Sequence, residues 1–316
     1  FEDALRAEID FARTAAPDHE LDWRGAHFPA LKLKGLTFPR KVLLVGAQLE
    51  HGAGMLNCVF AEGLDASRST FLGGGRNVTF ERCNFRGETS FWAAKFGKNP
   101  LIDRCVFEKK VQFQSCRLDT PDFTENQFLG GVQFAMATFS GACDFKLCQF
   151  WKEADFLSMM VESDAKFDFR NCKFFGVLNF GAHDEQDALS CSNVDLSRGV
   201  TVAEKGSLNF QNMQISSGTF RQLELLEGAT LRFADMSFGA ADFRDIVQRE
   251  KVTVTFDNTR LDNATFLNTN IEKFGFIDVA WREIDGRKGL VTEVELRSAV
   301  SSLPRDTVLG SEDMLR

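Results

Sequence analysis

The sequence predicts an elongated repeat protein, built from short extended segments that are joined by corners. Its large apolar residues recur at steps that alternate between six and five, which gives an 11-residue unit. In the clearest window they are Phe128, Phe134, Phe139, Phe145, Phe150, Phe156, Val161 and Phe167. Two positions before each lies another residue, apolar and mostly small in seven of the eight cases, with Asn126 as the exception. This period is neither the 3.6 of a helix nor the 2.0 of a long amphipathic strand.

The same pair of a small and a large residue recurs outside this window, on both sides of it. Earlier copies are Cys83–Phe85, Ala94–Phe96, Cys105–Phe107, Val111–Phe113 and Cys116–Leu118. Later copies are Leu208–Phe210, Met213–Ile215, Leu223–Leu225, Ala241–Phe243, Ala264–Phe266 and Thr269–Ile271. Self-similarity over this length indicates a repeat array. Each unit presents one inward pair at alternate positions, then a corner, then another inward pair.

The cysteines follow the repeat, which favours a packing role over a metal site, a redox pair or a disulfide. Seven of the eight lie two positions before a Phe or Leu, in the small inward position: Cys58, Cys83, Cys105, Cys116, Cys143, Cys148 and Cys172. Free cysteine behaves as a small hydrophobic residue and is often fully buried. A zinc site usually contains close CxxC pairs, and the sequence has none. We therefore expect buried, reduced thiols, which are typical of the cytosol.

Short motifs of a small residue, Asp or Asn, and Phe resemble the consensus of the pentapeptide-repeat family. They are Cys143-Asp144-Phe145, Ala154-Asp155-Phe156, Cys83-Asn84-Phe85 and Ala241-Asp242-Phe243, within a region from Trp23 to Trp281. The resemblance implies an all-β fold, a right-handed quadrilateral β-helix over residues 21–282. About a dozen coils at the inter-strand spacing would form a rod roughly 60 Å long. The expected core includes Cys83, Phe85, Cys105, Phe107, Cys143, Phe145, Cys148, Phe150, Ala154 and Phe156.

The two ends of such a rod need covers, because their backbone and apolar faces are open. Residues 1–20 are predicted to contain an N-terminal capping helix, with Phe1, Leu5, Ile9 and Ala12 on one side. Residues 283–316 are predicted to form a helical cap or extension, in which Thr292–Glu295 fits a capping box. Its apolar stripe is Leu296, Val300 and Leu303, which would contact either the last coil or a second copy in a homodimer.

Four interruptions of the repeat are predicted to be loops that project from the rod: residues 72–77, 97–104, 181–193 and 244–252. The third contains His183, Asp184, Glu185, Gln186 and Asp187, a candidate contact for a basic partner or a cation. A charged run in a loop is usually a solvated tip, and that alternative stays open. Gly130, Gly131 and Gly141 are expected at corners that need unusual backbone angles.

Composition and motifs give no catalytic residues, cofactor or metal site. The net charge is −8 and the pI is about 5.2, so direct binding of nucleic acid is not expected. No apolar run is long enough for a membrane helix, and the first residues lack a secretion signal, which favours a cytoplasmic protein. The four histidines have no nucleophile or base pattern around them. The GGGR stretch at 73–76 lacks the Lys-Ser/Thr ending of a phosphate-binding loop.

Three classes of function fit these observations. The first is a non-catalytic scaffold that binds a protein partner of unknown identity through a rigid repeat surface, and the sequence favours it. The second is a DNA mimic that modulates or protects a topoisomerase such as gyrase, as the family resemblance suggests. The modest excess of 45 acidic over 37 basic residues argues against that reading. The third is the recognition module of a larger effector or toxin with its active domain elsewhere.

Overall fold

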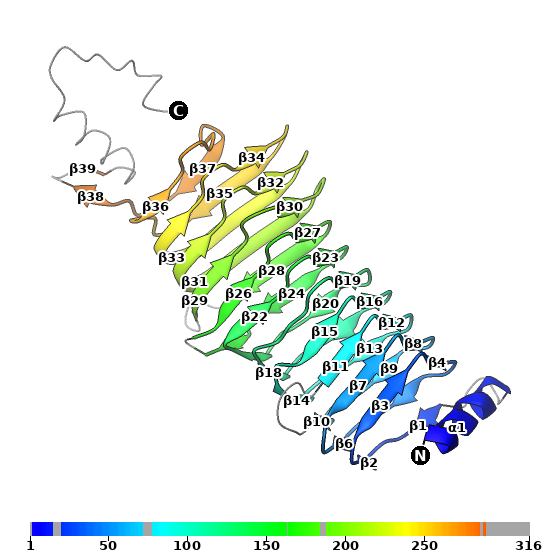
Figure 1. The fold of residues 1–316 in the computed structure, drawn as a ribbon. Coiled ribbons are helices and arrows are strands. Elements are labelled where there is room, and N and C mark those ends of the chain that lie inside the picture. The colour runs from blue at the N-terminus through cyan, green and yellow to red at the C-terminus, as the bar shows by residue number, and fades with distance from the viewer. Residues whose placement is uncertain are drawn as a thin grey trace.

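The computed structural model describes residues 2–14, 20–71, 78–162, 164–183, 188–284 and 287–288. These residues form a parallel β-solenoid of about eleven turns, with one helix, α1 (Glu2–Thr14), at its N-terminal end (Figure 1). The predicted β-helix is therefore confirmed. Each coil passes through four faces, and equivalent strands of successive coils pair in parallel.

Strands of the four faces follow one another in the same order in each coil (Figure 1). The first face contains β1 (Leu21–Asp22), β5 (Val42–Leu43), β9 (Leu64–Asp65), β13 (Thr89–Ser90), β17 (Val111–Gln112), β20 (Val132–Gln133), β24 (Ala154–Leu157), β28 (Val177–Gly181), β35 (Thr253–Asp257) and β37 (Phe274–Ile277). The second contains β2 (His27–Phe28), β6 (Gln48–Leu49), β10 (Thr70–Phe71), β14 (Lys95–Lys98), β18 (Arg117–Asp119), β21 (Thr138–Ser140) and β25 (Met160–Val161).

The third face contains β3 (Leu31–Lys34), β7 (Ala53–Leu56), β11 (Val78–Glu81), β15 (Leu101–Asp103), β22 (Ala142–Asp144), β26 (Lys166–Asp168) and β36 (Ala264–Thr265). The fourth contains β4 (Thr37–Phe38), β8 (Val59–Phe60), β12 (Asn84–Phe85), β16 (Val106–Phe107), β19 (Gln127–Phe128), β23 (Gln149–Phe150), β27 (Lys173–Phe174), β30 (Thr201–Val202), β32 (Glu224–Leu225) and β34 (Val247–Gln248). Three longer strands continue around the corners between faces: β29 (Leu189–Asp195), β31 (Ser207–Thr219) and β33 (Thr230–Asp242).

Rows of phenylalanine fill the interior of the rod, because the parallel register places equivalent residues of successive coils beside one another. One row contains Phe38, Phe60, Phe85, Phe107, Phe128, Phe150 and Phe174. Neighbouring rings in this row are nearly parallel, with centroids 4.8 to 5.3 Å apart. This is about the inter-strand spacing, so the backbone pairing itself sets the ring stacking. The rows supply the core that no single coil could bury.

Left-handed backbone at corner residues other than glycine is one feature that the repeat did not reveal. The residue before an inward small residue often has positive φ although it is not glycine, as in Arg82 (φ 52°), Arg104 (φ 52°) and Leu147 (φ 60°). Of the three predicted corner glycines, Gly131 (φ 92°) and Gly141 (φ 65°) have positive φ. Gly130 does not, but a Cβ there would lie 2.1 Å from the carbonyl carbon of Lys109.

The prediction of projecting loops was wrong for two of the four interruptions. Residues 97–104 contain the end of β14 and all of β15, and residues 244–252 contain β34. Inward apolar residues such as Ile102 and Ile246 persist there, and backbone pairing tolerates the polar residues that point outward. The 181–193 interruption is a strand from Leu189 onward, while residues 72–77 lie outside the described part of the chain.

At the N-terminal end, α1 lies beside the first coil, as Figure 1 shows. Its residues Ile9 and Ala12 are buried, and the indole Nε1 of Trp23 donates to both carboxylate oxygens of Glu8 at 3.1 and 3.3 Å. At the other end, β38 (Glu283–Ile284) and β39 (Arg287–Lys288) form an antiparallel pair. The helix expected to begin at Thr292 lies outside the described residues.

Candidate functional site

A column of small residues runs along the interior, at the corner that precedes the fourth face. Its members are Cys58, Cys83, Cys105, Asn126, Cys148 and Cys172, all at most 1% exposed. Four of the thiols donate to a backbone carbonyl of the preceding coil. The pairs are Cys83 with Met55 (3.2 Å), Cys105 with Phe80 (3.3 Å), Cys148 with Phe123 (2.7 Å) and Cys172 with Phe145 (2.8 Å). From Cys83 to Cys172 the position therefore holds a small side chain that also donates a hydrogen bond, whereas the equivalent residues of the next two coils, Val200 and Leu223, are apolar.

Asn126 performs the same task in the middle of this column. Its Nδ2 donates to the carbonyl of Ile102 at 2.6 Å, and its Oδ1 accepts the backbone N–H of Cys105 at 2.8 Å. The polar exception noted in the sequence is thus an amide whose nitrogen and oxygen both have hydrogen-bond partners in the buried interior, as is usual for buried polar groups.

The environment of the thiols suppresses their chemistry. Burial raises the pKa of Cys116 and Cys191 to about 12, and raises the pKa of Cys148 well above its usual range. A hydrogen bond with the Cys105 thiol raises the pKa of Cys83 to about 12. Because the thiolate is the nucleophile and the metal ligand, these thiols are inert at neutral pH. No disulfide joins the eight buried cysteines.

The aspartates of the repeat lie outside and stabilise corners. The carboxylate of Asp168 accepts the backbone N–H of Arg170 at 3.0 Å and pairs with the guanidinium of Arg170 at 2.6 Å and with Lys146 at 3.3 Å. Burial raises the pKa of Asp168, but the hydrogen bonds from Arg170 and the nearby charges outweigh it and lower the pKa overall. Aspartates that cap the backbone N–H two residues further on are Asp22, Asp65, Asp122, Asp155, Asp168, Asp195 and Asp242. These carboxylates have a structural role.

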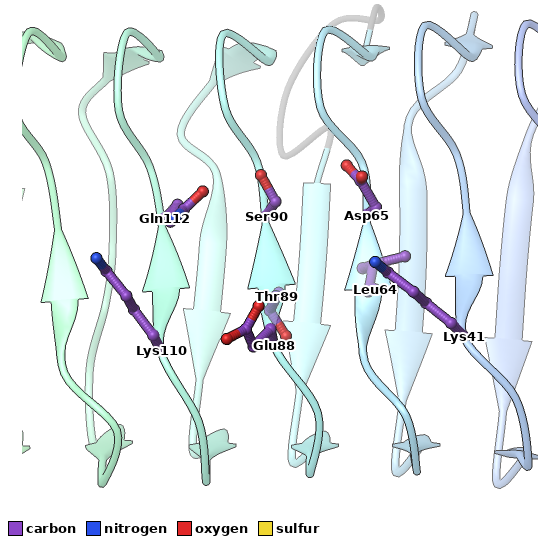
Figure 2. A pocket seen from close by; sticks show the side chains of 8 residues that line it. All are labelled: Lys41, Leu64, Asp65, Glu88, Thr89, Ser90, Lys110 and Gln112. Atoms are coloured by element: carbon purple, nitrogen blue, oxygen red, sulfur yellow. The ribbon is translucent and has the colours of Figure 1, made fainter.

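A small polar hollow of about 220 Å³ lies on the first face (Figure 2). Figure 2 shows Glu88 between Lys41 and Lys110, with Ser90 further along the same segment of the chain, in β13. The hollow exists because Gly63 separates Lys41 from Glu88, and a Cβ at Gly63 would lie 2.1 Å from the carbonyl oxygen of Glu88. The Ser90 hydroxyl is already 2.8 Å from that of Ser67.

An apolar strip marks the corner that follows the fourth face, and we call it the apolar ridge. It contains Leu129, Trp151, Phe175, Ala203 and Leu226, which occupy equivalent places in five successive coils. Trp151 is 43% exposed and stacks on Phe175 with ring centroids 4.1 Å apart. The sequence hypotheses missed this ridge, although a large apolar residue directly after the inward Phe, as in Phe150-Trp151 and Phe174-Phe175, was a visible signal.

The structure places the ten core residues proposed from the sequence inside the rod, each at most 1% exposed. His183 is exposed, and its carbonyl oxygen accepts from the Nδ2 of Asn212 at 3.3 Å. Asp184, Glu185 and Asp187 lie outside the described residues, as do Leu296, Val300 and Leu303. In the described ranges, no group of three or more His, Cys, Asp or Glu side chains could hold a metal ion. No helix among those residues combines the length and apolarity needed to cross a membrane.

Comparison with known families gives one match. Residues 102–149 match the family model described as pentapeptide repeats, with nine copies of the repeat. This segment covers coils from the middle of the rod, where the Cys and Phe rows are regular. No curated protein matches the chain.

Proposed function

The chain belongs to the pentapeptide-repeat family, and from that premise we propose that it is a non-catalytic scaffold that binds another protein. Repeat solenoids present long rigid surfaces whose outward residues vary freely, because the inward residues alone maintain the fold. The buried thiols and the capping aspartates both have structural roles here, which leaves the outer surface as the functional part.

The apolar ridge is the observation that carries this proposal. Trp151 and Phe175 form a stacked aromatic pair on the surface, and the coils on both sides add Leu129, Ala203 and Leu226. The equivalent positions beyond the ridge are charged, with Glu108 before it and Arg249 after it. Aromatic residues inside a polar rim are typical of energetic hot spots in protein interfaces.

The alternative of a DNA mimic is less well supported. A duplex-like surface needs a continuous row of uncompensated negative charge. The aspartates of the third face are instead paired, as with Asp168 to Arg170 and Lys146, and with Asp242 to Arg244 at 2.8 Å. A supercoiling assay with purified gyrase tests the alternative directly, and inhibition at stoichiometric protein would favour it. The third class of function, the recognition module of a larger effector or toxin, would bind its target through the apolar ridge as well.

The remaining proposals concern the ends and the compartment. We propose that α1 covers the first coil, since Ile9 and Ala12 are buried beside it. A cap or homodimer contact through Leu296, Val300 and Leu303 also stays a proposal. Eight unpaired buried thiols support a reducing compartment such as the cytoplasm.

Capture from the native cell tests the scaffold proposal. The bait is the wild-type protein or a Trp151→Lys/Phe175→Glu variant, in which both changes lie on the surface of the ridge. Trp92→Lys is the matched control, because Trp92 is 38% exposed at a different corner. The proposal expects a protein that wild type and the control retain and the ridge variant loses. Equal capture by all three baits would refute a role for the ridge.

A further inference from the structure

A second surface lies at the N-terminal end of the third face, where Arg6 of α1 lines a hollow together with residues of β3, β7 and β11. The hollow has a volume of about 570 Å³, and we call it the basic hollow. It is lined by Arg6, Lys32, Leu33, Lys34, Gly54, Met55, Leu56, Thr79 and Glu81. The apolar ridge lies at the corner after the fourth face and in later coils of the rod, so the two surfaces are separate.

The charge of the basic hollow is positive and largely uncompensated, in a chain whose net charge is −8. Arg6, Lys32 and Lys34 are exposed, and none of them is in an ion pair among the described residues. The one carboxylate in the lining, Glu81, already contacts Arg104 at 3.2 Å and Arg82 at 3.4 Å. Within the described part of the chain, three cations therefore line the hollow without an ion-pair partner.

Gly54 provides the floor of the hollow. It lies in β7 between Lys32 and Thr79 of the adjacent coils, where each neighbour projects a side chain. Its φ is not positive, and a Cβ there would meet only Lys32 Cγ at 3.9 Å, an ordinary contact. Unlike Gly63, this glycine is not required by the backbone. Beside it, Leu56 is half-buried, which makes part of the floor apolar.

We propose that the basic hollow binds an acidic, extended segment of a partner protein. Lys32 and Lys34 both point outward from β3 and lie two residues apart, so their Cα atoms are roughly 7 Å apart along the strand. Carboxylates on alternate residues of an extended segment have the same spacing. An apolar side chain further along the same side of that segment would lie over Gly54 and Leu56. The inference deepens the scaffold proposal, and rests on it only in taking the partner to be a protein.

The apolar floor favours such a segment over a nucleic acid. A phosphate backbone binds through cations alone and gains nothing from Leu56 or from the space over Gly54. The net negative charge of the chain also repels an extended polyanion. Rim charges of this kind contribute mainly to association rate and specificity, and their effect falls with salt.

Fluorescence anisotropy with a defined peptide tests the inference. The probe is a fluorescein-labelled peptide in which two glutamates and then a leucine alternate with serines, and the control probe has glutamines in place of the glutamates. We expect saturable binding of the glutamate peptide that weakens with salt. Lys32→Glu/Lys34→Glu should weaken it by on the order of tenfold or more. Gly54→Val should also weaken it, because valine fills the floor and suits a strand.

Matched variants separate loss of the site from loss of the fold. Lys95→Glu/Lys166→Glu reverses two exposed lysines elsewhere on the rod. Gly275→Val adds the same side chain at a glycine whose φ is not positive and whose Cβ would meet Thr255 no closer than 3.6 Å. Both controls should bind like wild type, and thermal unfolding of all four variants should stay within a few degrees of wild type.

The inference would be overturned by an absence of saturable binding at millimolar peptide, or by equal binding of the glutamine peptide. Equal affinity in the Lys32→Glu/Lys34→Glu variant, or tighter binding of a single-stranded oligonucleotide of the same charge, would overturn it too. None of these outcomes affects capture through the apolar ridge, so failure of this inference is distinguishable from failure of the scaffold proposal.

Discussion

Replacing Asn126 tests whether the inward column selects hydrogen-bond donors or merely small side chains. Asn126 is fully buried, donates to the carbonyl of Ile102 at 2.6 Å and accepts from the N–H of Cys105 at 2.8 Å. Asn126→Ala keeps a small residue but removes both hydrogen bonds. Asn126→Cys instead restores the residue found in the coils on either side.

The size of the effect follows from the groups left without a partner. Each buried backbone group that loses its partner costs about 1–3 kcal/mol, so Asn126→Ala should lower the free energy of unfolding by about 2–6 kcal/mol. Asn126→Cys should lower it by about 1 kcal/mol or less, because the neighbouring cysteines show that a thiol fills both roles. Cys105 Sγ donates to the carbonyl of Phe80 at 3.3 Å and accepts from the N–H of Cys83 at 3.4 Å.

Urea unfolding, followed by circular dichroism and by tryptophan fluorescence, measures the difference. Trp151 lies one coil further along the rod and reports on the affected region. Gln127→Ala is the control, since Gln127 is the next residue and points into solvent. A midpoint for Asn126→Ala close to that of the control would refute the reasoning, and so would an Asn126→Cys variant as unstable as Asn126→Ala.

Three further predictions follow from the same structure. A thiol reagent should leave the eight buried thiols of the native protein unmodified at pH 8, and rapid labelling would contradict this. The free energy of unfolding should fall as the pH rises above about 9, because the thiols ionise in the unfolded protein while the buried thiols of the folded protein do not. Gly181→Ala should destabilise the folded protein by about 3 kcal/mol or more in thermal unfolding, because a Cβ there would lie 1.8 Å from the Gln211 carbonyl oxygen. Gly25→Ala, the control, should cost about 1 kcal/mol, because a Cβ there would meet open space. Asp168→Ala should cost about 1–2 kcal/mol at pH 7. Because the pKa of Asp168 is lower in the folded than in the unfolded protein, that difference should begin to shrink as the pH falls through about 4 and should be lost only below the folded pKa. A difference that stays constant through a pH titration would show that the carboxylate charge is irrelevant.

The repeat period was enough to predict a repeat array and its inward residues, and the resemblance to the pentapeptide-repeat family implied the β-helix. In a repeat protein each coil contacts equivalent positions of its neighbours, so one local pattern specifies the long-range pairing. The loop predictions failed for a related reason. Residues 97–104 and 244–252 look irregular in outward composition, yet Ile102 and Ile246 keep the inward positions, and the backbone pairs with adjacent coils regardless of what points outward.

The sequence by itself determined the interior of this protein: which residues face inward, that the cysteines are packing residues, and that Phe rows form the core. That information is local, because it depends on spacing along the chain. Only the tertiary structure decided what the surface presents. Trp151 and Phe175 are 24 residues apart in the sequence, and Arg6 is far from Thr79, so their proximity depends on how many residues each coil contains. Coil length varies as corners gain or lose a residue, and stacking of the coils fixes which outward side chains become neighbours.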